Sequence, residues 1–360
     1  MGGCGKLDGI AHRIPTGVYK LLLVVATVIW GLSFVVMKDA VDVLQPAYLI
    51  GFRFLATGAI LAALFFRRLR AALSGERALD YLVKGTILGV VCYLAFWVQT
   101  IGLDHTTPGK NAFLTATYCV IVPFAWWAIA RKRPTAFNLV AAVMAVCGIG
   151  LVSLAGSLSE LTMGFGDAMT LVSALLFAVH IVYVSKFSEK SDVLVLTLLQ
   201  FAVGGVCGVA YGACFETLPP AESLTPAFWM NMAYLVVFAS CVALVIQNVA
   251  LAHVPPAQAS LFLGLESVFG VLFSVLLYGE EIGLRLVGGF ALIFVAIVVS
   301  ETFPLKSKAG DDAPALALET PGGPVVSPEP LGMLGARDAD GRAAVESMQE
   351  EASWSKSGTT

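Results

Sequence analysis

The chain has 360 residues, of which 58% are hydrophobic and 13% are charged, and its mean hydropathy is +0.84. Soluble domains carry about 25% charged residues. This chain therefore cannot cover a water-facing surface, and lipid must be its solvent. The net charge of −3 and the short basic runs do not indicate nucleic-acid binding. The seven cysteines form no CxxC or Cys/His cluster, and no metal motif or P-loop occurs, so the sequence predicts no metal, no cofactor and no ATP-driven pump.

Apolar segments of about 20 residues follow one another along the chain, each long enough to cross a bilayer as an α-helix. The first starts near Leu21 and has no small-residue cleavage site after it, which favours a membrane span over a cleaved signal peptide. Pro, Gly and charged residues separate the segments. The expected spans are 19–38, 47–66, 82–103, 109–130, 136–154, 166–186, 193–214, 230–251, 257–277 and 284–302.

The distribution of Lys and Arg predicts the orientation of these spans. If the N-terminal segment 1–18 is cytoplasmic, the cytoplasmic segments beside the spans hold 15 Lys and Arg residues, whereas the outer loops hold 3. Both termini are then expected in the cytoplasm, in a multi-pass protein of the plasma or inner membrane. Residues 303–360 are rich in Pro, Gly, Ala, Ser and acids, which predicts a disordered cytoplasmic tail.

The stretch Trp97–Phe124 has a second copy 148 residues later, in which Gln247 aligns with Gln99 and Pro256 aligns with Pro108. Each copy is an apolar segment, a Pro-containing turn and another apolar segment. This pattern predicts two copies of one membrane unit. Because each copy holds five spans, an odd number, the second must lie inverted in the membrane. Two inverted copies usually bind a substrate near mid-membrane, where they meet. The expected units are 19–154 and 166–302, joined by a linker at 155–165.

Four stretches carry a family resemblance: WGLSF at Trp30–Phe34, FRF at Phe52–Phe54, Gly102–Pro123, and Ala250–Ile282 with its Gly279-Glu280 pair. Together they resemble the EamA family of the drug/metabolite transporter superfamily over roughly residues 19–302. The resemblance implies an all-α membrane protein of ten transmembrane helices in two inverted five-helix (EamA-type) repeats, with a central cavity. It also implies alternating-access movement of small metabolites, commonly export. One departure is that Arg131-Lys132-Arg133 replaces the Gly-Glu pair in the first half.

Glu266 lies near the middle of the ninth expected span, where an ionisable group is costly and favours a functional role. It could bind an amino group or exchange a proton. The alternative is a protonated side chain that joins two helices by a hydrogen bond. Its counterpart in the repeat is Tyr118, and an acid paired with a phenol would suit an asymmetric polar solute.

On the fourth expected span, Asn111, Thr115 and Tyr118 share one helical face. Lys110 stands at the start of that helix, where the helix dipole and the cation both favour an anionic group. It could equally reach the outer lipid headgroups. Its repeat counterpart is Gln258, on the ninth span.

Tyr93 and Trp97 share a face of the third expected span, and Trp97 could stack on a solute or anchor the helix at the membrane interface. Trp30 lies in the first span, and its counterpart in the sixth is Phe177. His180 could exchange protons together with Glu266. A neutral histidine that bonds a neighbouring helix is the more common arrangement for polar groups in bundles.

Arg53 is the one basic residue well inside an expected span, and it could bind an anion or pair with a helix-end carbonyl or an acid at the outer face. Gln99 and Gln247 occupy mirrored positions, and the favoured interpretation is that they bond loose carbonyls of the adjacent turns. Asp167, just before the sixth expected helix, is predicted to be an N-cap.

These features predict a secondary transporter, not an enzyme. The expected activity is export of a small polar or amphipathic metabolite, such as an amino acid or a drug-like compound, by alternating access. Its expected partners are the solute, the lipid bilayer and protons as a coupling ion, and no feature indicates an oligomeric state. The alternative is an intramembrane enzyme or a non-transporting receptor. Ser33, Ser173 and His180 occur in spans, but no nucleophile lies in a recognisable Gly-flanked motif, and an enzyme needs no inverted halves.

Overall fold

The computed structural model describes residues 15–131, 133–155, 162–254, 256–281 and 283–302. These residues belong to one compact unit. Most of the expected N-terminal segment, most of the linker and the whole tail 303–360 lie outside the described residues, as does the side chain of Gln258.

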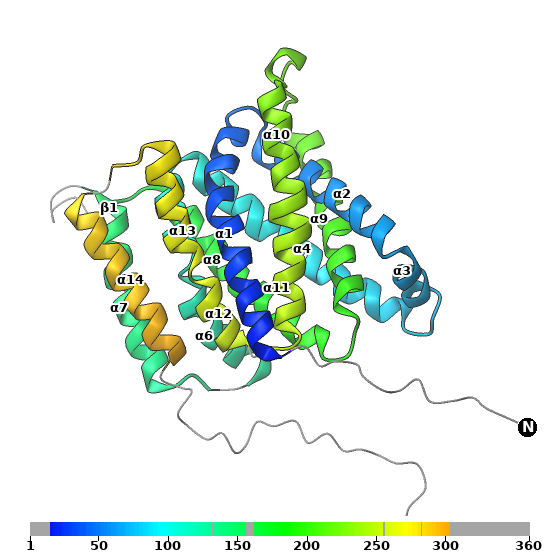
Figure 1. The fold of residues 1–360 in the computed structure, drawn as a ribbon, viewed down its shortest axis with the longest axis horizontal. Helices are drawn as coiled ribbons and strands as arrows, with labels where there is room; N and C mark the ends of the chain where they lie inside the picture. The colour runs from blue at the N-terminus through cyan, green and yellow to red at the C-terminus, as the bar shows by residue number, and fades with distance from the viewer. Residues whose placement is uncertain (1–14, 132, 156–161, 255, 282, 303–360) are drawn as a thin grey trace, which may run out of the picture. The chain divides into compact units, whose positions relative to one another are not determined.

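The described chain is almost entirely helical (Figure 1), as lipid requires, because a backbone without water must satisfy its own hydrogen bonds. In the first half the helices are α1 (Thr16–Val41), α2 (Pro46–Leu64), α3 (Phe66–Leu73), α4 (Ala78–Asp104), α5 (Pro108–Thr115), α6 (Tyr118–Ala130) and α7 (Ala136–Ser153). In the second half they are α8 (Phe165–Ser188), α9 (Val193–Phe215), η1 (Ala221–Ser223), α10 (Pro226–Tyr234), η2 (Leu235–Val242), α11 (Ala243–Leu251), α12 (Pro256–Leu263), α13 (Glu266–Phe273), η3 (Ser274–Tyr278) and α14 (Leu284–Thr302).

The structure adds three features to the expected helices. A two-residue antiparallel pair joins β1 (Leu154–Ala155) to β2 (Thr162–Met163), so the described residues are not purely helical. The short helix α3 follows the second expected span and buries none of its residues. The segments η2 and η3 are π-helical, a form that occurs mostly as single turns and often at functional sites.

Within the described residues, seven helical stretches are long and apolar enough to cross a membrane. They are Thr16–Val41, Pro46–Leu64, Ala78–Asp104, Pro108–Ala130, Phe165–Ser188, Val193–Phe215 and Pro226–Leu251. The other three expected spans coincide with shorter apolar helices, Ala136–Ile149, Glu266–Tyr278 and Leu284–Val299.

The helix boundaries repeat along the chain at the same offset of 148 residues as the sequence. The fourth and ninth expected spans are both interrupted, one before Tyr118 and the other before its counterpart Glu266. The helices that match at this offset begin at Pro108 and Pro256, at Tyr118 and Glu266, and at Ala136 and Leu284. The repeat is therefore a property of the backbone as well as of the sequence.

Equivalent helices of the two halves pack against each other in opposite directions. Along α2 and α9, Gly51 approaches Gly208, and further on Gly58 approaches Ala202, so the residue numbers run in opposite senses. Small residues at these crossings let the two backbones come close. Helix α7 packs along α14, and Figure 1 shows that these two also run in opposite directions.

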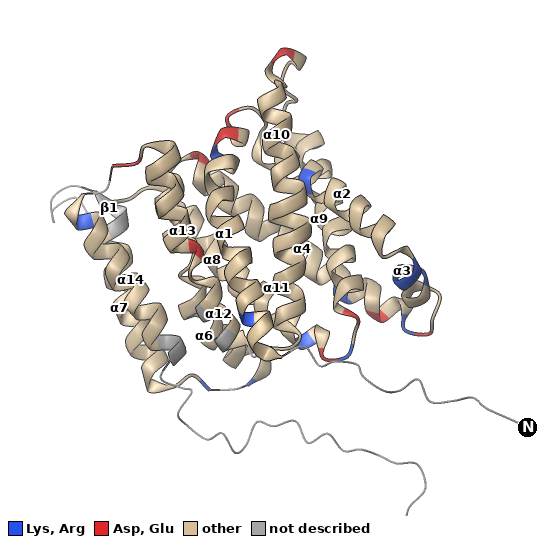
Figure 2. Cartoon of the chain, viewed as in Figure 1, with Lys and Arg blue, Asp and Glu red and all other residues tan. Residues whose placement is uncertain are grey.

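Charged residues gather at the two ends of the helices, and Lys and Arg concentrate at the end where α1 begins and α3 lies (Figure 2). At that end Arg68 pairs with Asp192 at 3.0 Å and Lys84 pairs with Asp80 at 2.8 Å. Most of these groups are half-exposed, so each such pair contributes little to stability.

At the end opposite to α3, three carboxylates join the two halves. Glu280 accepts hydrogen bonds from Gly109 N, at 2.9 Å, and from the hydroxyls of Thr107 and Ser274. It thereby neutralises the N-terminus of α5, where the helix dipole favours a negative charge. Glu216 accepts in the same way from the backbone N–H groups of Ala47 and Tyr48, each at 2.8 Å, at the start of α2. The third carboxylate, Asp167, belongs with the site described below.

Two residues at equivalent positions of the repeat adopt a left-handed backbone. Arg131 ends α6 with φ 62°, and Gly279, 148 residues later, ends η3 with φ 73°. Glycine adopts this conformation without strain, whereas a side chain costs about 1–2 kcal/mol. The first half thus keeps the backbone turn of the second half although its glycine has been replaced by arginine.

This pair gives a prediction about stability. Gly279→Ala should lower the free energy of unfolding by about 1–2 kcal/mol, because a Cβ there meets open space and only the backbone is strained. Arg131→Gly should raise it by about 1 kcal/mol or less. Gly283→Ala, also in open space but with no left-handed backbone, is the control. Thermal unfolding of the purified protein measures all three. Equal effects at Gly279 and Gly283 would contradict the backbone explanation.

A second prediction concerns the carboxylate at the start of α5. Glu280→Ala should cost about 1–3 kcal/mol, because it leaves part-buried donors at Thr107 and Gly109 without a partner. Glu281→Ala, one residue further along and exposed, should change stability by less than about 0.5 kcal/mol. The measurement is the same unfolding experiment, and a Glu281 effect as large as that of Glu280 would show that the capping interaction contributes nothing specific.

Candidate binding cavity

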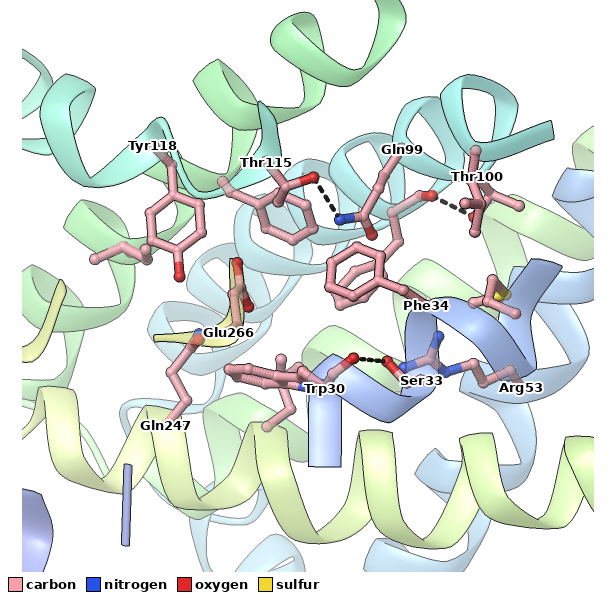
Figure 3. Close-up of a pocket in the computed structure, with 16 residues that line it drawn as sticks. Trp30, Ser33, Phe34, Arg53, Gln99, Thr100, Thr115, Tyr118, Gln247 and Glu266 are labelled. Atoms are coloured by element: carbon pink, nitrogen blue, oxygen red, sulfur yellow. Dashed lines mark hydrogen bonds between the residues drawn. The ribbon is translucent and has the colours of Figure 1, made fainter. Parts of the chain in front are cut away.

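A cavity lies inside the bundle, between helices of both halves (Figure 3). The space between its lining atoms is about 580 Å³, within the usual range of small-molecule sites. Polar and charged side chains share its wall with aromatic ones. The lining residues are Trp30, Ser33, Phe34, Met37, Arg53, Phe96, Gln99, Thr100, Leu103, Thr115, Tyr118, Phe177, Ile181, Leu244, Gln247 and Glu266.

Equivalent positions of the two halves contribute to this wall in pairs. Gln99 and Gln247 line it from α4 and α11, and Tyr118 and Glu266 line it from the first turns of α6 and α13. Further pairs are Phe96 with Leu244 and Trp30 with Phe177. The cavity is therefore where the two repeated units meet.

Glu266 is 5% exposed and begins α13, just after the interruption that separates α12 from α13. Its Oε1 atom is buried and has no hydrogen-bond partner among the described residues. The hydroxyl of Tyr118 points toward the Glu266 carboxyl, which places the two repeat counterparts side by side (Figure 3). A buried, unpartnered acceptor is costly, so this atom is available to a donor that enters the cavity.

Arg53 of α2 brings a second charge to the cavity. It is 1% exposed, its Nε donates to the hydroxyl of Ser240 at 2.6 Å, and its guanidinium carbon lies 5.1 Å from the centre of the Phe96 ring. Within the described part of the chain, no carboxylate lies within ion-pair distance of it. Neither alternative expected from the sequence, a helix-end carbonyl or an acid at the outer face, is its partner.

The π-helical segment η2 connects Arg53 to Trp30. Ser240 donates its own proton to Leu235 O at 2.9 Å, a carbonyl five residues earlier that this winding brings within reach. Trp30 Nε1 donates to Ala239 O at 2.9 Å in the same segment. Both lining side chains are therefore held in place by one irregular stretch of helix.

A hydrogen-bonded chain fixes the polar wall opposite Glu266. Gln99 Nε2 donates to the Thr115 hydroxyl at 3.0 Å. Asn111 donates to Thr170 at 2.7 Å and to Gln99 O at 3.3 Å. The interpretation that Gln99 bonds loose carbonyls of the adjacent turn is therefore wrong, since its amide bonds a side chain of the cavity wall. Asn111 lies behind this wall rather than on it.

Lys110 lies apart from the cavity and forms an ion pair. Its Nζ is 2.8 Å from Asp167 Oδ2, and Thr106 donates to the other carboxylate oxygen at 2.9 Å. The prediction that Asp167 caps α8 is wrong, because Gly164 is the N-cap and Asp167 lies in the first turn. With Asp167 as its partner, Lys110 is not free to bind an anion from the cavity.

The remaining candidate residues pack elsewhere. Tyr93 and Trp97 stack on each other at 5.9 Å, and Trp97 also contacts Tyr211 of α9 at 4.6 Å, outside the cavity lining. His180, 1% exposed, lies 3.2 Å from Gln200 Oε1, which also accepts from Asn248 at 3.3 Å. This buried polar cluster connects α8, α9 and α11, the arrangement expected of a histidine that bonds neighbouring helices.

Four candidate residues from the sequence therefore meet at the cavity: Glu266, Tyr118, Thr115 and Trp30. Sequence reasoning did not assign Gln99, Gln247, Ser33 and Thr100 to it. The mirrored glutamines carried a usable signal, since two equivalent polar residues are expected to face the interface between two copies. No group of three or more potential metal ligands occurs among the described residues.

Comparisons with known proteins agree with this architecture. The model of the EamA-like transporter family matches residues 18–154 and again residues 164–302. An uncharacterized transporter of Archaeoglobus fulgidus is 27% identical over 302 residues, which cover 82% of this chain and 90% of that protein. The uncharacterized inner membrane transporter YedA of Escherichia coli K12 is 22% identical, over 78% of this chain and 90% of its own.

A protein of known crystal structure aligns with 81% of this chain and 99% of its own, at a TM-score of 0.60 and 15% identity, a likeness that shows the fold alone. The family match extends over nearly all described residues and occurs twice, at the two units that the repeat separates. The resemblance inferred from the sequence motifs is thus confirmed. The chain belongs to the EamA-like transporter family and is a multi-pass membrane protein.

Proposed function

We propose that the protein is a secondary transporter that exports a small polar or amphipathic metabolite by alternating access through the cavity. The observation that carries the proposal is the place of Glu266. This acid is buried, lacks a partner at Oε1, and lines a cavity between two repeated units. Ionisable groups inside a membrane bundle typically mark substrate or proton pathways.

Ten spans in two inverted repeats are the arrangement that the proposal requires. The antiparallel packing of α2 with α9 supports it, because two equivalent helices run in opposite directions only if their units are inverted. The antiparallel packing of α7 with α14 supports it in the same way. A cavity at the interface of such units can open to one side and then to the other by rocking of one unit against the other.

The proposed orientation places both termini in the cytoplasm. The end of the bundle with most Lys and Arg, where α1 begins, then faces inward, as such residues do in membrane proteins. The three carboxylates Glu280, Glu216 and Asp167 lie at the outer end and join the two units there. Their contacts would have to separate when the cavity opens outward.

Within this proposal the candidate residues take different parts. Glu266, with Tyr118 beside it, binds the solute and exchanges a proton that couples its movement. Thr115 and Trp30 line the path. Asn111, Lys110 and His180 hold helices together behind it, and Tyr93 with Trp97 packs α4 against α9. Gln258 is assigned a place on the path from the repeat alone.

The proposal predicts the effect of removing the acid. Glu266→Gln keeps the size and polarity of the side chain but cannot ionise, so it should abolish export. Glu222→Gln, on the exposed segment η1, is the matched control and should export normally. The measurement compares small molecules inside and outside cells that produce the unmodified protein or either variant.

The expected result is a metabolite that accumulates outside cells with the unmodified protein and with Glu222→Gln but not with Glu266→Gln. Export by Glu266→Gln at an unchanged rate and with unchanged pH dependence would show that the assigned role of Glu266 is wrong. If no metabolite changes across a broad panel, uptake must be measured in reconstituted vesicles before transport itself is rejected.

A further inference from the structure

Arg53 is a buried cation whose charge no described residue neutralises. Its Nε is engaged by Ser240, and no hydrogen bond to a described residue involves the two terminal nitrogens. The side chain lines the cavity, and Figure 3 shows the guanidinium directed into it beside Ser33. Burial of an uncompensated cation is costly, so an anionic group is the missing partner at this end of the cavity.

The opposite wall of the same cavity carries the complementary charge. Figure 3 shows Glu266 and Tyr118 on one side and Arg53 on the other, with the cavity between them. Among the described residues, Glu266 and Arg53 form no ion pair with each other or with another side chain. The empty cavity therefore presents an acid and a base that are separated from each other.

The wall between these two groups is apolar. Trp30, Phe34, Phe96 and Phe177 line it, together with Met37. Aromatic rings favour contact with an apolar body, and they exclude water, which strengthens the interactions of the charges at both ends.

We propose that the solute is a zwitterion whose anionic group binds Arg53 and whose ammonium group binds Glu266, with an apolar portion against the aromatic wall. This inference rests on the proposed function, because it names the class of solute for the same cavity. The planar guanidinium, with Nε already bonded, keeps two parallel N–H groups for the two oxygens of a carboxylate.

The arrangement favours a zwitterion over a simple anion or cation. An anion would neutralise Arg53 but would add nothing for Glu266, and a cation would leave Arg53 buried without a partner. A zwitterion satisfies both groups and adds no net charge to the membrane interior. Ser33 and Ser240 beside Arg53 also offer polar contacts at the carboxylate end of the solute.

The test uses the purified full-length protein and a matched set of three probes: phenylalanine, phenethylamine, which lacks the carboxylate, and 3-phenylpropionate, which lacks the amine. A second set built on leucine in the same way covers a smaller apolar portion. Affinity is measured by calorimetry or by the shift in thermal unfolding. The unmodified protein should bind the zwitterion at least about tenfold more tightly than either analogue, since each lacks one charge-assisted contact.

Variants then assign each end of the solute. Arg53→Gln should lose about tenfold or more in affinity for the zwitterion and the acid but leave the amine unchanged. Glu266→Gln should weaken the zwitterion and the amine but leave the acid unchanged. Arg70→Gln, at an exposed position of α3, is the control for Arg53 and should bind all three probes as the unmodified protein does.

Because a buried arginine can be needed for folding, Arg53→Lys provides a second test that keeps the cation. It should retain the preference for the zwitterion and the acid over the amine, with weaker binding. The ratio of affinities within one variant does not depend on its stability. Equal losses for all three probes in Arg53→Gln, or no preference for the zwitterion in the unmodified protein in either set, would overturn the inference.

Counterflow in reconstituted vesicles separates this inference from the proposed function. If the protein moves other solutes but prefers no zwitterion, the transporter proposal stands and the solute class is wrong. If it binds zwitterions with the expected dependence on Arg53 and Glu266 but moves none of them, the solute class stands and the transporter proposal fails.

Discussion

The structure depends on the cost of placing a charge where water does not reach. Most carboxylates at the ends of the bundle meet this cost with a local partner: Asp167 has Lys110, Glu280 has the start of α5, and Glu216 has the start of α2. Glu266 and Arg53 meet it only in part. Since both line one cavity, the unmet cost is concentrated where a solute could meet it.

The two halves share a backbone plan but differ in chemistry at equivalent positions. Tyr118 corresponds to Glu266, and Arg131 corresponds to Gly279 in the same left-handed turn. Glu280 corresponds to Lys132, and a cation is not favoured at a helix N-terminus. A shared backbone gives two units of similar shape, which alternate access needs, whereas the unequal side chains bias one end of the cavity toward closure. The carboxylate of Glu280 can therefore close one end only.

Much of the fold follows from the sequence, because apolar length locates the helices and the offset of 148 residues pairs Tyr118 with Glu266. The interruptions before these residues were not foreseen, since Thr117 and Leu265 are compatible with a continuous helix. Shared helical faces were also insufficient. Tyr93 and Trp97 do share a face, but it meets α9 rather than the cavity. Lys110 finds Asp167 on another helix, a contact that no local spacing indicates.

Arg53 shows how a small backbone irregularity can determine the chemistry of a site. An ordinary helix would direct the Ser240 hydroxyl to the carbonyl three or four residues earlier. In the π-helical segment the hydroxyl donates to Leu235 O instead, and its lone pair is free to accept from Arg53 Nε. That bond fixes the plane of the guanidinium and leaves its other edge toward the cavity. Trp30 is bonded to the adjacent Ala239 carbonyl, so any change in this winding would move the cation and the aromatic wall together.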